Sequence, residues 1–154
     1  EGPRAQRREV LRRANVLSIN HAEARELTNE ANLVKAARAI RAMGPSTVVI
    51  KRGEHGVLMT RPGEGEFFAA PAMPLEEVFD PTGAGDTFAG GFMGSLAACG
   101  EVTDAALARA IIYGGTLASF AVEDFSLERL LRLTQAEIAD RFRCFRRLTF
   151  FDET

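Results

Sequence analysis

The residues best suited to chemistry lie in one stretch, DPTGAGDTFAGGFM, at positions 80–93. Asp86 follows three small residues, Gly83-Ala84-Gly85, and an apolar pattern of helical spacing begins directly after it. Small residues let a ligand approach the backbone closely. The N–H groups of a first helical turn, aided by the helix dipole, bind anions such as phosphate. A carboxylate in that turn can accept a proton from a hydroxyl group. The stretch therefore combines two parts that phosphoryl transfer needs.

A purely structural interpretation of the same stretch is also open. Acids are common in first helical turns because the helix dipole favours them, and Gly-rich turns often precede helices. The stretch has no GxxxxGK[ST] pattern, and Gly83-Ala84-Gly85 is followed by Asp86-Thr87-Phe88, so GxGxxG spacing is absent too. These departures exclude a Walker-type phosphate loop and a dinucleotide-binding fingerprint.

The elements that must position this turn alternate along the chain. Short apolar segments predict strands at 16–20, 47–51, 57–60 and 67–70, and periodic segments predict helices at 4–14, from 21, and at 33–44, 83–99, 103–122, 127–133 and 136–145. In the helix at 83–99, Phe88, Phe92 and Leu96 are four residues apart and form one apolar stripe. Alternating strands and helices predict an α/β fold with a largely parallel sheet.

The stretch at 80–93 resembles the C-terminal signature of the ribokinase/PfkB family of sugar and nucleoside kinases. The resemblance implies a ribokinase-like fold, with three layers around a largely parallel central sheet. It makes Asp86 the catalytic base and Gly83, Ala84 and Gly85 the anion hole. In this family the base takes a proton from a hydroxyl of a sugar or nucleoside as that hydroxyl attacks the γ-phosphate of ATP.

The segment NHAE at 20–23 has two interpretations. Asn20 followed three residues later by Glu23 is a capping box at the start of a helix. The segment also resembles the N-x-x-E motif of the family, which helps to place magnesium and phosphate. In that role Glu23 would act on Mg²⁺ largely through metal-bound water, and Mg²⁺ typically keeps several waters.

Two loops add further candidate positions. IKRGEHG at 50–56 predicts a hairpin turn, and it also resembles the K-x-G-x-x-G loop that lies along the nucleotide in the family, with Lys51, Gly53 and Gly56 as the matching residues. Asp80 and Thr82 match positions around a monovalent-cation site, which would bind K⁺, in many members of the family. Pro81 departs from the small polar residue often found between them.

The helix at 103–122 corresponds to the segment that borders the adenine in the family. The resemblance makes Tyr113, Gly114 and Leu117 the wall of that site, and ordinary helix packing explains the same residues equally well. Glu123 and Asp124 are interpreted as helix-end residues, not as catalytic groups. Neither His21 nor His55 is assigned a metal.

Composition limits the remaining classes of protein. The chain has 154 residues, a net charge of −2 and a pI near 5.8, and a single α/β domain over residues 1–154 is predicted. The charge argues against nucleic acid as a partner, despite an Arg-rich start, and no apolar run is long enough to cross a membrane. Cys99 and Cys144 lie in apolar helical surroundings, which predicts buried thiols in a reducing compartment and a cytoplasmic location.

The resemblance runs from about Val10 to Phe151 but matches only the C-terminal half of the family's usual length. The half that carries the acceptor-binding and lid elements is expected to be absent, so the acceptor cannot be named. One expectation is an ATP- and Mg²⁺-dependent kinase acting on a small sugar or nucleoside. The alternative is a nucleotide-binding module without catalysis. A halved sheet exposes an edge and apolar surface, which predicts self-association into a homo-oligomer.

Overall fold

The computed structural model describes residues 9–61, 66–150 and 152. The chain forms two compact units. Unit 1 consists of residues 1–53 and 57–69, and unit 2 consists of residues 54–56 and 70–154. The prediction of a single α/β domain is not tested by this division and stays a prediction.

The sheet of unit 1 has four strands in the order β1-β2-β3-β4. Their bounds are β1 Val16–Asn20, β2 Thr47–Lys51, β3 Val57–Thr60 and β4 Phe67–Ala70. β1 runs parallel to β2, whereas β2 and β3 are antiparallel. The sheet is therefore mixed, and the prediction of a largely parallel sheet is wrong for these strands. Only residues 52–56 join β2 to β3, and a parallel connection needs about a dozen residues or more.

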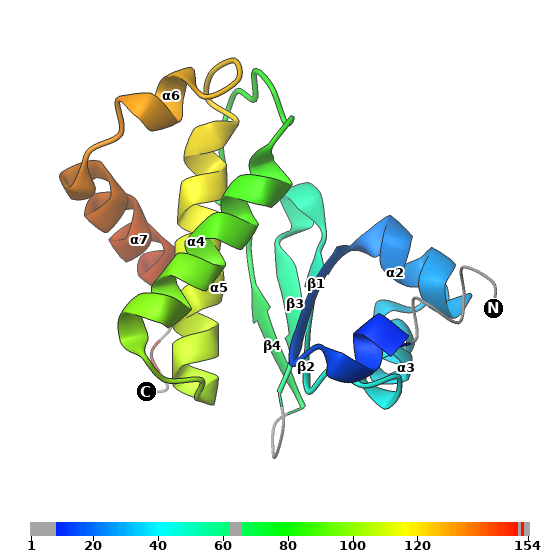
Figure 1. Cartoon of the computed structure of the whole chain (residues 1–154). Helices are drawn as coiled ribbons and strands as arrows, with labels where there is room; N and C mark the ends of the chain where they lie inside the picture. The colour runs from blue at the N-terminus through cyan, green and yellow to red at the C-terminus, as the bar shows by residue number, and fades with distance from the viewer. Residues whose placement is uncertain (1–8, 62–65, 151, 153–154) are drawn as a thin grey trace. The chain divides into compact units, whose positions relative to one another are not determined.

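Helices α2 (His21–Thr28) and α3 (Leu33–Ala42) cover one face of this sheet (Figure 1). Asparagine caps both of them: Asn20 begins α2 and Asn32 begins α3. The core between helices and sheet is closely packed, and its fully buried members are Ala24, Ala37, Ile40, Val48 and Ile50. This core fixes the direction in which β1 leads into α2.

Unit 2 is built from helices: α4 Ala84–Cys99, α5 Asp104–Ala121, the single turn α6 Glu128–Leu131, and α7 Gln135–Thr149. A short 3₁₀ turn, η1 (Gly53–His55), precedes β3. α4 and α5 run side by side in opposite directions, and α7 packs on α5 (Figure 1). The predicted stripe of α4 is confirmed, since Phe88, Phe92 and Leu96 are all buried.

One prediction in unit 2 is confirmed only in part, and another is wrong. The helix expected at 127–133 is reduced to Glu128–Leu131, because Leu127 and Arg132 at its two ends both depart from helical geometry. The buried thiols are also not observed. Cys99 is exposed and Cys144 is partly exposed, since Cys99 is the last residue of α4 and the whole segment 97–103 faces solvent.

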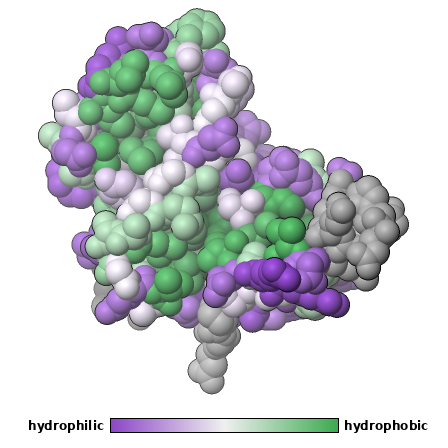
Figure 2. All heavy atoms as spheres, in the orientation of Figure 1, coloured by the Kyte–Doolittle hydropathy of each residue, from purple (hydrophilic) through white to green (hydrophobic). Residues whose placement is uncertain are grey.

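Apolar side chains gather on the surface of unit 2 around α6 (Figure 2). Phe125, Leu127 and Leu131 are exposed there by 64%, 59% and 78%. Among the residues that the structure describes, no helix is long and apolar enough to cross a membrane. The predicted self-association is not tested by the fold of one chain and stays a prediction.

The start of α7 carries a densely bonded carboxylate. Glu137 forms a capping box with Thr134, in which the Thr134 hydroxyl and N–H donate to Glu137 Oε2 over 2.7 and 2.9 Å. Arg129 Nη2 donates to Glu137 Oε1 over 2.7 Å. The Thr134 hydroxyl, the Thr134 amide and then the Arg129 guanidinium lower the pKa of Glu137 from its ordinary 4.5 to about 2. The charged carboxylate therefore stabilises the folded chain.

This lowered pKa predicts that the folded chain loses stability as the solution becomes acidic. Because the folded state binds the proton of Glu137 less tightly than the unfolded state, the contribution is complete above about pH 4.5 and is lost as the pH falls toward about 2. The urea concentration at the midpoint of unfolding should therefore fall less steeply with decreasing pH in Glu137→Gln than in the unmodified protein. Urea titrations of both proteins at several pH values measure it. An equally steep decline in the variant would show that other carboxylates cause the loss of stability in acid.

Candidate functional site

The predicted catalytic turn opens α4 through an unusual backbone conformation. Gly83 caps the helix in the left-handed region, with φ of 81°, and no side chain caps it. A Cβ atom at this position would meet nothing within 4 Å. Glycine is therefore needed here for its conformation and not for lack of space. The Gly83 carbonyl accepts the first helical hydrogen bond, from Thr87 N–H over 2.9 Å.

The three backbone amides that follow Gly83 in the chain differ in their hydrogen bonds. The Ala84 N–H donates to the Pro81 carbonyl over 3.2 Å, which closes a tight turn. In the described part of the chain, neither the Gly85 nor the Asp86 N–H has a backbone or side-chain acceptor. These two donors lie at the positive end of a sixteen-residue helix and can bind an anion. The geometry thus supports Gly85 more directly than Ala84 as an anion donor.

Asp86 occupies the third position of α4, the acid of its first turn, and is exposed. Its carboxylate makes no hydrogen bond or ion pair with any residue that the structure describes. A carboxylate left unbonded beside free amide donors is accessible to a hydroxyl group on a bound molecule. The arrangement fits general-base chemistry, because geometry within reach of the proton is the first requirement.

The turn is braced by Asp80. Its Oδ1 accepts from Thr82 N–H over 2.9 Å. The Thr82 hydroxyl, the Thr82 amide and the Ser126 amide together hold the pKa of Asp80 below its usual range. Asp80 and Thr82 therefore bond to each other, which shapes the chain just before Gly83. Their predicted role around a monovalent cation stays a prediction.

Asn20, Glu23 and Lys51 come together in unit 1. The capping box is confirmed: Glu23 N–H donates to Asn20 Oδ1 over 2.8 Å, and Asn20 N–H donates to Glu23 Oε2 over 3.0 Å. Asn20 pairs with Lys51 in the parallel register of β1 and β2, so both lie at the carboxyl ends of neighbouring strands. Ligands bind at this edge of open α/β sheets.

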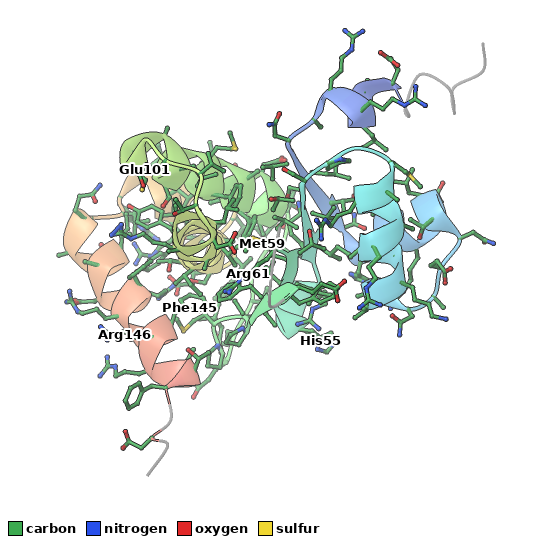
Figure 3. The ribbon with its side chains drawn as sticks, turned by 90° about the horizontal axis from the view of Figure 1, so that it is seen from below. His55, Met59, Arg61, Glu101, Phe145 and Arg146 are labelled. Atoms are coloured by element: carbon green, nitrogen blue, oxygen red, sulfur yellow. The ribbon has the colours of Figure 1, made fainter. Side chains whose placement is uncertain are left out.

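The metal prediction fits the residues present. Glu23 is exposed, and the capping box engages only its Oε2. Its second oxygen is thus available to a water on Mg²⁺, an ion that needs few protein ligands. Among the described residues, no group of three or more His, Cys, Asp or Glu side chains could hold a metal by itself. His21 begins α2, and His55 is an exposed turn residue (Figure 3).

The glycines of the 50–56 loop both require left-handed backbone. Gly53 has φ of 60° with open space around it, and Gly56 has φ of 80°. A Cβ at Gly56 would lie 2.0 Å from the Ala70 carbonyl oxygen, so a side chain is excluded there. The backbone conformation therefore explains by itself why glycine stands at both positions, and their proposed contact with a nucleotide stays a prediction.

The three α5 candidates all have packing partners within unit 2. A Cβ at Gly114 would lie 2.7 Å from the Phe88 carbonyl oxygen, where α4 and α5 approach closely. Leu117 packs over Gly91 of α4, and the Tyr113 ring lies 6.1 Å from that of Phe142 on α7. The packing interpretation of these residues is thus supported, and their role as an adenine wall stays a prediction.

Sequence reasoning missed one group of residues beside the turn. Glu123, interpreted as a helix-end residue, bonds both Arg129 and Arg141. Its backbone neighbour Val122 accepts the Phe79 N–H over 2.9 Å. The only signal in the sequence is an acid at the end of a helix with arginines downstream, which does not reveal a three-dimensional network.

Solved structures define the class of protein. The chain superposes on aminoimidazole riboside kinase from Salmonella enterica with a TM-score of 0.74 and 26% identity, over 94% of this chain and 47% of that one. Fructokinase from Vibrio cholerae gives a TM-score of 0.80 at 21% identity, over 90% and 44% of the two chains. The expected ribokinase-like α/β fold is therefore confirmed.

The family follows from the sequence match. Residues 2–131 match the pfkB family of carbohydrate kinases, and the chain belongs to this family. Cytidine kinase of Thermococcus kodakarensis is 43% identical over 88 residues, or 56% of this chain and 31% of that protein. Bifunctional protein HldE of Stutzerimonas stutzeri is 31% identical over 140 residues, or 88% of this chain and 29% of that protein. The chain spans about a third of the length of these relatives.

The close approach of α4 and α5 leads to a prediction about the free energy of unfolding. Gly114→Ala should destabilise the chain by about 1–3 kcal/mol, because the added methyl group meets backbone that cannot move aside. Gly94→Ala is the matched control. It places the same methyl group on α4 in open space and should stabilise by up to about 1 kcal/mol. Urea unfolding measures both, and equal effects would contradict the packing role of Gly114.

Proposed function

We propose that this chain carries the ATP-binding and phosphoryl-transfer part of a kinase that phosphorylates a hydroxyl group of a small sugar or nucleoside. The observation that carries the proposal is the left-handed Gly83 turn, which opens α4 with unbonded Gly85 and Asp86 amides and an unbonded Asp86 carboxylate. Membership of the pfkB family supports it.

Asp86 is the proposed catalytic base. Its carboxylate takes the proton of the acceptor O–H as the acceptor oxygen forms a bond to the γ-phosphorus of ATP. The bond from that phosphorus to the β,γ-bridging oxygen breaks, and its electron pair leaves with ADP. A base positioned in this way contributes roughly 10²–10⁴-fold to the rate.

The Gly83-Ala84-Gly85 turn is the proposed anion hole. The Gly85 and Asp86 N–H groups, at the positive end of α4, would donate to the negative charge that develops on the transferred group. Gly83 makes this possible by turning the chain sharply enough to present them. Such preorganised donors need no rearrangement during the reaction.

Asn20, Glu23 and Lys51 are proposed to support the nucleotide. Glu23 would hold Mg²⁺ through water, and the ion would supply neutralisation of phosphate charge. Lys51, with Gly53 and Gly56, would lie along the nucleotide, and Tyr113, Gly114 and Leu117 would border its base. K⁺ near Asp80 and Thr82 and a cytoplasmic location belong to the same proposal.

The nature of the relatives is consistent with the proposed acceptor class. One curated relative is a cytidine kinase, and the riboside kinase structure contains aminoimidazole riboside and an ATP analogue. A nucleotide-binding module without catalysis is the alternative. The unbonded Asp86 carboxylate favours the kinase, because binding alone does not need a base beside the phosphate site.

Asp86→Asn tests the proposed base. It should lower the rate of ATP-dependent phosphorylation of a sugar or nucleoside panel by roughly 10²–10⁴-fold, because the amide cannot accept the proton. ATP affinity, measured by calorimetry, should stay nearly unchanged. ADP release in the presence of each acceptor measures the rate.

The matched control is Asp104→Asn. Asp104 is the acid in the first turn of α5, so the same chemical change is made at another helix start. This control should leave the rate within about twofold of the unmodified protein, as most surface changes do. Turnover by Asp86→Asn equal to that of the control would remove Asp86 from the proposed role.

A further inference from the structure

The loop after α5, residues 122–126, touches the catalytic turn at its entrance. The Val122 carbonyl accepts the Phe79 N–H over 2.9 Å. The Thr82 hydroxyl and amide, with a smaller contribution from the Ser126 amide, lower the pKa of Asp80, whose Oδ1 accepts from Thr82 N–H over 2.9 Å. The loop therefore holds the chain at the two residues that lead into the Gly83 turn.

The side chain of Glu123 anchors this loop to two further elements. Its Oε2 accepts from Arg129 Nε over 3.0 Å, and its Oε1 lies 2.6 Å from Arg141 Nη2. Arg129 comes from α6 and Arg141 from α7. One carboxylate thus binds two guanidinium groups, each through a different oxygen.

The two arginines that bind Glu123 both lie over the ring of Phe120. The Phe120 side chain is 2% exposed, and the guanidinium carbons of Arg129 and Arg141 lie 4.8 and 3.5 Å from its ring centroid. The side chains of Arg129, Arg141 and Glu123 are only 16–23% exposed. Ion pairs held away from water are less screened than surface pairs, and cation–π contacts add to them.

Two arginines in this network also have partners of their own. Arg129 bonds Glu137 over 2.7 Å, and Arg141 Nη1 donates to Ser119 Oγ over 3.2 Å. Both arginines would therefore keep a partner if Glu123 lost its charge. Among the described residues of loop 122–126, Asp124 pairs with Arg132 just beyond α6, whereas Glu123 is the side chain that joins this network. Glu123 is therefore the side chain that ties the loop to α7.

We propose that Glu123 is a positioning residue for phosphoryl transfer. By binding Arg129 and Arg141 together, its carboxylate fixes loop 122–126, and the loop fixes Phe79 and Asp80 at the entrance of the Gly83 turn. The relation to phosphoryl transfer rests on the proposed function of that turn. The mechanical coupling from Glu123 to Phe79 and Thr82 does not, because it concerns the free protein.

The test is amide exchange with solvent, measured by NMR on the full chain without ATP or acceptor. In Glu123→Gln, which keeps the shape of the side chain but removes its charge, the exchange rates of the Phe79 and Thr82 amides should rise by about tenfold. Amides in the middle of α5, such as those of Ala110 and Ile111, should not change, because the effect is local.

Glu137→Gln is the matched control. It makes the same chemical change in the same network, on α7, and it removes the negative charge of Glu137 beside Arg129 while both contacts of Glu123 remain. Exchange at Phe79 and Thr82 should be unaffected by it. Arg141→Lys is a second variant, which keeps the positive charge but loses the two-point contact with Glu123 and Ser119. It should accelerate the same two amides.

Three results would overturn the proposal: unchanged exchange at Phe79 and Thr82 in Glu123→Gln, an equal rise at all amides, or an equal effect of Glu137→Gln. Each can be observed whether or not the protein is a kinase. Once an acceptor is known, Glu123→Gln should lower kcat more than it raises the KM for ATP, since it displaces the turn and not the nucleotide contacts. An inactive protein with the expected exchange pattern would contradict the proposed function alone.

Discussion

The left-handed conformation of Gly83 is the constraint on which the candidate site depends. It lets the chain pass from an extended segment into α4 within one turn, with the Ala84 N–H bonded back to Pro81. The Gly85 and Asp86 amides are then left for a ligand, at the positive end of a helix whose buried stripe holds it in place. A residue with a Cβ would have to adopt a strained backbone here.

The other features of unit 2 make sense as supports of that turn. The close approach of α4 and α5 at Gly91 and Gly114 leaves the two helices little freedom to slide, so the axis of α4 is fixed. α7 is fixed on α5 by Phe145, which is buried and points toward α5, while Arg146 beside it points away (Figure 3). Asp80 completes the support by shaping the backbone just before Gly83.

Local patterns in the sequence were sufficient for much of the fold. The stripe of α4 and the capping box of Asn20 and Glu23 depend on residues a few positions apart, and both are confirmed. The Glu123 network was not predicted, because it depends on what distant segments bring to the same place. The exposure of Cys99 was not predicted either, although it follows from the place of this residue at the end of α4. The hairpin turn predicted at 50–56 is confirmed, because β2 and β3 are antiparallel, and this short connection is what makes the sheet mixed. The family resemblance predicted which residues form the anion hole. The structure was needed to distinguish the bonded Ala84 amide from the unbonded Gly85 amide.

The central claim is that the first turn of α4 binds the phosphates of ATP. An NMR titration of the isotopically labelled chain with Mg·ATP tests it most directly, with the backbone amides of Gly85 and Asp86 as reporters. The amides of Gly94, in the second half of the same helix, and of Gly100, which caps its C-terminal end, are the controls. The account predicts saturable shifts at Gly85 and Asp86 that exceed those of the controls. If a folded chain shows no shift at these two amides at millimolar Mg·ATP, the turn is not a phosphate site and the account is contradicted.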